Sequence, residues 1–170
     1  MASLVSLDRL TDPGTRDMQR LKTNFPAPVV ALAVGGIMKL YALAAQISID
    51  TSPILAEVGI RLTQVSAAIF LAALASFWLA RTTINPLDPS RASTLVTGGI
   101  YRLTRNPMCL SLLLLLIAYA LRLGSWVALL GPASYAIYVT RFHIIPEEKV
   151  LAEKFGAAFH SYVSRTRRWI

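Results

Sequence analysis

The chain has 170 residues, of which 55% are hydrophobic, and a formal net charge of +8. Soluble domains are usually about 45–50% apolar, so the apolar excess predicts an integral membrane protein. The positive charge does not indicate nucleic-acid binding, because cytoplasmic loops of membrane proteins collect Lys and Arg and no basic cluster here alternates with aromatic residues.

Two long apolar segments in the first half predict transmembrane helices, Pro28–Ile47 and Val58–Ala80. Each has roughly the 20 residues that cross a bilayer as a helix. The charged residues 1–25 form a predicted cytoplasmic segment, and residues 26–80 form a predicted two-helix unit. Lys39 lies in the middle of the first span, where it faces the bundle interior or snorkels to the interface.

Residues 81–170 form a second predicted unit that begins with a polar loop rich in proline and glycine. Two apolar runs follow, Met108–Leu123 and Ser125–Ile145, on either side of Gly124. The first run is about 24 Å long as a helix, which is short for a full span. We therefore expect the two runs to form a helical hairpin whose tip lies near the far interface.

The last segment predicts an amphipathic helix on the cytoplasmic side. Pro146 suits a first helical position, and Glu147 and Glu148 suit the first turn, while Gly156 is expected to break the helix. Of the 17 Lys and Arg residues, 14 fall in the N-terminal segment, the polar loop and the C-terminal segment, when Arg141 at the end of the last apolar run is counted with the C-terminal segment. The positive-inside rule then places both termini in the cytoplasm. We expect four crossings of a bacterial inner membrane.

The base of the predicted hairpin brings five polar residues together on the cytoplasmic side: Arg105, Asn106, Arg141, Glu147 and Glu148. Each alone is typical of an ordinary helix anchor or helix start. Together they indicate a pocket at the membrane interface, where ionisable groups often have a functional role.

Two stretches that flank the hairpin carry a family resemblance. They read Gly99-Ile100-Tyr101-Arg102-Leu103-Thr104-Arg105-Asn106-Pro107-Met108 and Arg141-Phe142-His143-Ile144-Ile145-Pro146-Glu147-Glu148, followed by Leu151, Phe155-Gly156, Tyr162 and Arg167-Arg168-Trp169. This order resembles the isoprenylcysteine carboxyl methyltransferase family and its bacterial relatives, which are related to phospholipid methyltransferases. The resemblance covers the chain from Leu95 to its end.

The resemblance implies an integral membrane enzyme that transfers a methyl group from S-adenosylmethionine to a lipophilic acceptor, such as the carboxylate of an isoprenylcysteine. It implies a cofactor site formed by ten residues. These are Tyr101, Arg105, Asn106, Pro107, Met108, Leu110, Glu147, Glu148, Phe155 and Phe159. Arg141 and Glu148 are the expected catalytic residues. An arginine would orient a carboxylate acceptor, whereas Glu148 would act as base toward an amine or thiol, with Arg141 as its partner.

The chain departs from the family pattern at several of these positions. Asn106 stands where many members have histidine, Cys109 and Phe159 where tyrosine is usual, and Ser111 where glycine is usual. The missing hydroxyl groups remove polar contacts, so a degenerate site that binds cofactor poorly is an alternative. Cys109 is the one cysteine of the chain, which excludes an internal disulfide and a cysteine-based metal site.

Other functions remain open. The acceptor could instead be a phospholipid amine or a small thiol. The chain could also be a non-catalytic membrane scaffold or a small transporter, although it lacks the internal repeat that is typical of transporters. The expected partners are a lipid-like or hydrophobic small molecule and membrane lipids, without nucleic acid or metal.

Overall fold

A computed structural model describes residues 25–47, 52–79 and 95–170. Within these ranges the regular structure is helical, as the sequence predicts. The elements are α2 (Ala27–Ala44), α3 (Pro53–Leu79), the 3-10 turn η3 (Gly99–Arg102), α4 (Pro107–Leu123), the 3-10 turn η4 (Trp126–Leu129), α5 (Leu130–Val139), the π-helical turn η5 (Thr140–Ile144), α6 (Ile145–Phe155) and α7 (Ala157–Val163). Most of the predicted N-terminal segment and of the polar loop lies outside the described residues.

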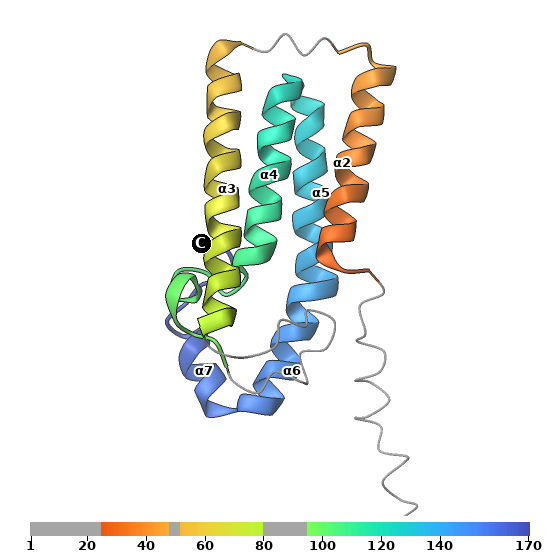
Figure 1. The fold of residues 1–170 in the computed structure, drawn as a ribbon. Coiled ribbons are helices and arrows are strands. Elements are labelled where there is room, and N and C mark those ends of the chain that lie inside the picture. The colour runs from red at the N-terminus through yellow and green to blue at the C-terminus, as the bar shows by residue number, and fades with distance from the viewer. Residues whose placement is uncertain (1–24, 48–51, 80–94) are drawn as a thin grey trace, which may run out of the picture.

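Four helices lie side by side as a bundle, and the remaining elements gather at one end of it (Figure 1). The bundle consists of α2, α3, α4 and α5. At one end lie η3, the start of α4, the helices α6 and α7 and the C-terminus. This arrangement places the two stretches of the family resemblance at the same end.

The outer faces of the bundle are apolar and exposed. By length and hydropathy α2 and α3 could each cross a membrane, and only 17% and 11% of their apolar windows are buried. Leu32 on α2 is 77% exposed and Trp78 on α3 is 81% exposed. Helices of a soluble core bury such residues, whereas apolar faces of this extent are typical of an interacting surface. The two helices therefore indicate association with a membrane.

Small residues let α3 lie close against α4. The buried residues of α3 are Gly59, Ser66 and Ala73, which are spaced seven apart and so share one face. Ser66 donates a hydrogen bond from its hydroxyl to the backbone oxygen of Ser111, at 2.7 Å. A Cβ atom on Gly59 would lie 3.2 Å from the backbone oxygen of Ala118. Close backbone approach and interhelical hydrogen bonds are what hold helices together in lipid.

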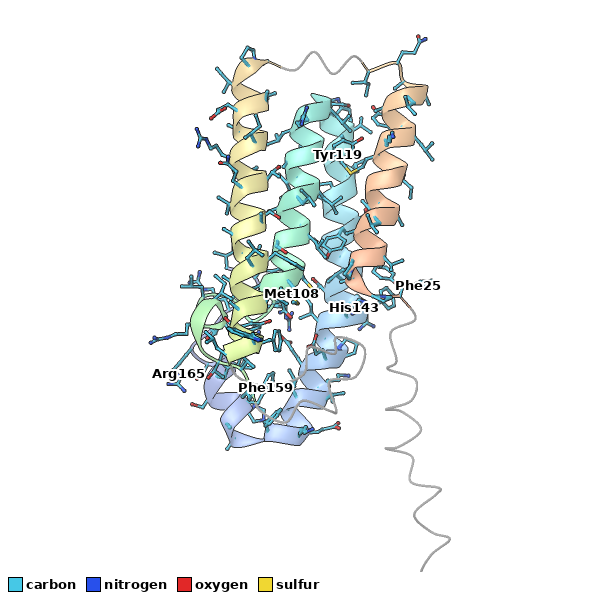
Figure 2. The ribbon with its side chains drawn as sticks, viewed as in Figure 1. Phe25, Met108, Tyr119, His143, Phe159 and Arg165 are labelled. Carbon is cyan, nitrogen blue, oxygen red and sulfur yellow. The ribbon has the colours of Figure 1, made fainter. Side chains whose placement is uncertain are left out.

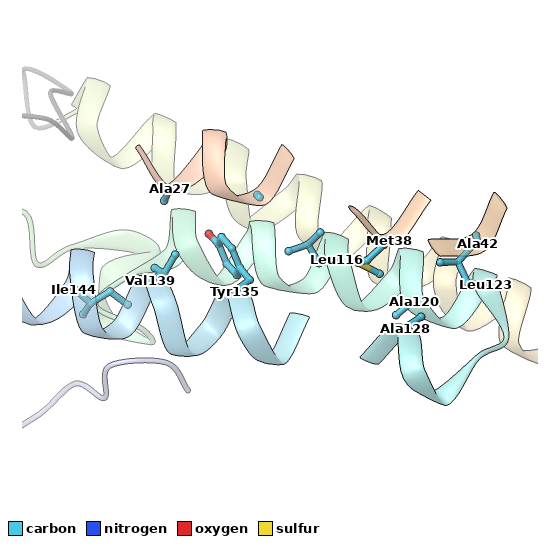
Figure 3. Close-up of a cluster of buried hydrophobic side chains, with 11 residues drawn as sticks. Ala27, Met38, Ala42, Leu116, Ala120, Leu123, Ala128, Tyr135, Val139 and Ile144 are labelled. Atoms are coloured by element: carbon cyan, nitrogen blue, oxygen red, sulfur yellow. The ribbon is translucent and has the colours of Figure 1, made fainter. Parts of the chain in front are cut away.

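The core lies where α2, α4 and α5 meet (Figure 3). Met38 of α2 and Leu116 of α4 pack there with Tyr135 and Val139 of α5, and the last two are fully buried. Gly131 lies so close to Met38 that a side chain on it would displace the methionine. This cluster fixes α5 against α4 and so positions the helices that continue from α5.

The predicted hairpin is present. Gly124 ends α4 in the left-handed conformation, with φ of 62°, which costs glycine little because it has no Cβ atom. The chain then turns through η4 into α5, and α4 and α5 pack against each other.

One predicted boundary was wrong, because the second span begins at Pro53 and not at Val58. The predicted helix start at Pro146 is confirmed within one residue, since α6 begins at Ile145 and Pro146 lies in its first turn, where proline is well tolerated. The chain enters α6 directly from α5 through the π turn η5. The predicted break at Gly156 is confirmed, with φ of 48° between α6 and α7.

Candidate functional site

Four helical elements, η3, α4, α6 and α7, and the C-terminal tail, Ser164–Ile170, meet at one end of the bundle (Figure 2). Figure 2 labels Met108 at the start of α4 and Phe159 on α7, which lie at this end. Met108 and Phe159 lie at the same end because the α4–α5 hairpin reverses the direction of the chain. The end of α5 therefore lies at the same end of the bundle as the start of α4.

Glu148 lies at the centre of this region, between two arginines. Its Oε1 atom is 3.1 Å from Nη2 of Arg105. Arg168 donates two hydrogen bonds to the same carboxylate, from Nε to Oε1 at 3.2 Å and from Nη2 to Oε2 at 2.6 Å. The hydrogen bond to Glu148 raises the pKa of Arg168. Both carboxylate oxygens are therefore engaged, and the fork of Arg168 fixes the plane of the carboxylate.

Arg105 keeps one donor unused. Its side chain is only 11% exposed, and its Nε atom is buried without a hydrogen-bond partner among the described residues. An unpaired buried donor is costly, and a charged one more so. The Nε–H group is therefore positioned to donate to an acceptor atom of a bound ligand.

The C-terminal tail lies against the segment that leads into α4. The backbone N–H of Arg105 donates to the backbone oxygen of Arg167 at 3.0 Å, and Thr104 and Arg167 form a parallel bridge. Asn106 donates from its side-chain Nδ2 to the backbone oxygen of Arg168 at 3.1 Å. The hydroxyl of Thr104 donates to the same oxygen at 3.2 Å. Asn106, expected as a cofactor ligand, thus also holds the tail.

Aromatic residues form a second wall. Tyr101 is buried, and its ring packs edge-on against Phe77 with centroids 5.4 Å apart. Tyr162 donates from its hydroxyl to the backbone oxygen of Tyr101 at 2.7 Å. Burial raises the pKa of Tyr162 to about 12 despite the nearby charge of Arg105. Burial also raises the pKa of Tyr101, with a further contribution from Glu147. Both hydroxyls are therefore neutral donors at physiological pH.

Glu147 differs from Glu148 in its surroundings. Burial, followed by the charge of Glu148, raises the pKa of Glu147 to about 7. Its carboxyl group interacts electrostatically with Tyr101 and Cys109. The described residues provide it with neither a hydrogen bond nor an ion pair. Two adjacent carboxylates with different environments are a recognised basis for acid–base chemistry.

The other predicted cofactor residues lie in the first turn of α4 and on α6 and α7, with different exposures. Pro107 and Leu110 are buried at the start of α4, and Met108 is partly buried. Phe159 on α7 is buried. Phe155 is partly buried, and Nζ of Lys154 lies 5.9 Å from the centroid of its ring.

Arg141 does not join the ion pairs of Glu148. It is exposed and lines a recess with Ile137 and Ile145. In an uninterrupted α-helix, residues seven apart such as Arg141 and Glu148 share a face. Arg141 itself lies in the π turn η5, whose wider winding shifts the register between Arg141 and Glu148 by about one residue, so the two residues do not share that face. The expected pairing of these two residues is replaced by that of Arg168 with Glu148.

An open recess of about 630 Å³ borders the site. Its walls come from residues 95–102, from α7 and from the start of the tail, and Tyr162, Arg102, Arg165 and Thr166 are among the residues that line it. Within the described part of the chain, no group of three or more His, Cys, Asp or Glu residues could hold a metal ion.

Sequence reasoning missed the roles of Arg168 and Thr104 at this site. Arg168 belongs to the Arg167-Arg168-Trp169 stretch of the resemblance, but no spacing rule links it to Glu148, because a break and a turn separate them. Thr104 directly precedes Arg105 and Asn106, which the sequence did predict as site residues. Its hydroxyl group, next to these two residues, was the feature that could have marked it as part of the site.

Comparison with known proteins yields a family model and one relative. The model, described as phospholipid methyltransferase, matches residues 56–158, which is more than half of the chain. A protein of Haemophilus influenzae (strain ATCC 51907 / DSM 11121 / KW20 / Rd) is 41% identical over 63 residues, which are 37% of this chain and 100% of that protein. Its name, "Uncharacterized protein", states no activity. No solved structure matches the chain significantly.

Proposed function

This chain belongs to the phospholipid methyltransferase family, and from that premise we propose that it transfers a methyl group from S-adenosylmethionine to a lipophilic acceptor at the membrane interface. In this proposal both termini are cytoplasmic and the four bundle helices cross a bacterial inner membrane. The cofactor reaches the site from the cytoplasm, and the acceptor enters from the lipid.

One observation carries the cofactor assignment, namely the buried Nε–H group of Arg105 that lacks an acceptor among the described residues. S-adenosylmethionine carries a carboxylate, and a guanidinium donates strong charge-assisted hydrogen bonds to such a group. The donor lies beside Glu148, which is 18% exposed and carries the charge that suits an ammonium or ribose hydroxyls. The residues present therefore fit this cofactor.

The other predicted cofactor residues complete the proposed site. Tyr101 and Phe159 are buried aromatic rings suited to flank an adenine or a sulfonium cation, and Phe155 on α6 is a further candidate. Asn106 is the N-cap of α4, and Pro107, Met108 and Leu110 belong to its first turn.

When bound, S-adenosylmethionine would supply a methyl group that is attached to a positively charged sulfur. The acceptor's electron pair would form the new bond to the methyl carbon while the carbon–sulfur bond breaks, and the sulfur would keep the electrons of that bond. The protein's contribution is mainly to align the acceptor with this group and to exclude water.

The class of acceptor depends on whether a base is needed. A carboxylate acceptor, as in an isoprenylcysteine, attacks without losing a proton, and an exposed arginine such as Arg141 would attract it. An amine or thiol acceptor must lose a proton. Glu148 is engaged by three contacts from two arginines, so we assign the base to Glu147, whose pKa is near 7. The family's description favours a phospholipid amine as the second candidate.

Cofactor binding by the detergent-solubilised protein tests the proposal. We expect micromolar binding of S-adenosylmethionine and S-adenosylhomocysteine by calorimetry. Arg105→Lys keeps the charge but loses the Nε donor, and should weaken binding about tenfold, or ~1.4 kcal/mol. Arg61→Lys, on the exposed pair that Arg61 makes with Glu57, is the matched control. A folded protein that binds neither compound would instead be a membrane scaffold.

Methyl transfer to three acceptors then separates the candidate substrates. The acceptors are a farnesylcysteine carboxylate, phosphatidylethanolamine and a small thiol, each supplied in mixed micelles. Glu147→Gln should abolish transfer to an amine or thiol but spare transfer to a carboxylate. Loss of carboxylate methylation in that variant, with cofactor binding intact, would contradict the assigned role of Glu147.

A further inference from the structure

We propose that the C-terminal tail is an arm of the cofactor site and that Arg168 is a positioning residue, which holds Glu148 so that the Nε–H group of Arg105 stays open to the ligand. This inference rests on the proposed function and assigns a role to a part of the chain that the family match, ending at residue 158, does not reach.

The tail is anchored at several points, so Arg168 has a defined place. The backbone contacts between Arg105 and Arg167 align the tail with the segment before α4. The side chains of Thr104 and Asn106 both donate to the backbone oxygen of Arg168. Trp169 is partly buried and packs against the hydrophobic cluster of the bundle. Polar and apolar contacts therefore fix both sides of Arg168.

The geometry of the two arginines explains why one donor stays unused. An arginine and a carboxylate prefer a bidentate pair, in which two parallel N–H groups meet two oxygens. Arg168 has taken this position, with contacts to both oxygens of Glu148. Arg105 reaches Glu148 through Nη2, at 3.1 Å from Oε1. Its Nε–H group remains unpaired among the described residues.

Without Arg168, Glu148 is free to rotate toward Arg105 and to form the bidentate pair with it. The carboxylate would then cover the Nε–H group and compete with the ligand's carboxylate for it. Arg168 thus acts on the ligand through Glu148 and not by contact. It also compensates one negative charge next to Glu147, whose pKa is sensitive to Glu148.

Arg167 provides a matched control. It is the neighbouring arginine in the same tail, but its side chain is exposed and does not contact Glu148. Its contact with Arg105 uses the backbone oxygen, which a substitution keeps. Arg167→Gln and Arg168→Gln each remove one positive charge from the tail. A difference between the ligand affinities of the two variants therefore reports the position of the guanidinium group and not the loss of charge.

The experiment is binding of S-adenosylhomocysteine by calorimetry to the full-length protein in detergent. Arg168→Gln should weaken binding about tenfold, whereas Arg167→Gln should change it less than about twofold. Arg168→Lys retains the charge without the fork and should lie between Arg168→Gln and the unchanged protein. Arg168→Lys also provides the binding test if the Arg168→Gln variant does not fold.

A double variant separates positioning from direct contact. If Arg168 acts only through Glu148, the variant with both Arg168→Gln and Glu148→Gln should bind as weakly as Glu148→Gln alone. Additive losses would mean that Arg168 contacts the ligand independently, and this would overturn the inference. Equal binding by Arg168→Gln and the unchanged protein would also overturn it, while the proposed function stands. No binding by the unchanged, folded protein would reject both.

Discussion

Replacing Glu147 by glutamine should stabilise the protein at neutral pH, although the residue lies in the candidate site. Glu147 has a pKa of about 7 in the folded protein and an ordinary value of 4.5. A difference of about 2.5 units corresponds to about 3 kcal/mol. The folded state binds the proton of the Glu147 carboxyl group more tightly than the unfolded state does. The stability that protonation of Glu147 contributes is therefore complete below pH 4.5 and is lost as pH rises through about 7. Glutamine keeps the shape and stays neutral.

The assay is unfolding of both proteins in detergent between pH 4.5 and pH 8. At the acidic end their free energies of unfolding should be nearly equal. At pH 8 the Glu147→Gln variant should be more stable, by up to about 3 kcal/mol. Glu153→Gln, which removes an exposed acid from the same helix, is the matched control for the loss of a negative charge. If the difference for Glu147→Gln did not vary with pH, or reversed at pH 8, the desolvation of Glu147 would be refuted.

Three further substitutions test the scaffold around the site. Gly99→Ala adds a Cβ 2.6 Å from the hydroxyl of Ser76 at a φ of 58°, and should cost about 1–3 kcal/mol. Adding Ser76→Ala should recover only part of the loss, and full recovery in thermal unfolding would show that the backbone is unstrained. Tyr162→Phe removes the hydrogen bond to Tyr101 and should cost about 1 kcal/mol; an unchanged midpoint would contradict it. Ser66→Ala removes a buried hydrogen bond to α4 and should cost about 0.6 kcal/mol, and a loss above about 2 kcal/mol would refute the view that it is a minor contact.

Periodicity and local signals were sufficient for most of the helices. The length of the apolar runs predicts α2 and α3, and Gly124 and Gly156 mark the ends of α4 and α6 because glycine adopts positive φ at low cost. The start of α3 was misplaced because Ser52 and Pro53 read as a loop, whereas proline is well tolerated in a first helical turn.

The sequence also placed Arg105 and Glu148 together, because the two ends of a hairpin meet at its base. It did not place Arg141 correctly, since a π turn has no clear sequence signal and changes the helical register between Arg141, which lies in the turn, and Glu148, which follows it. Proximity along the bundle axis could be inferred from helix lengths, but the direction of each side chain around the axis could not.

The sequence by itself determined the class of the protein: a helical chain with two segments long and apolar enough to cross a membrane and a polar end that resembles membrane methyltransferases. These properties depend on composition and on patterns a few residues long. The tertiary structure decided which charges meet. Arg168 reaches Glu148 only because the break at Gly156 and the turn after α7 carry the tail back to Thr104 and Asn106. That return depends on hydrogen bonds from side chains to the backbone over more than 60 positions of sequence, which no local pattern encodes.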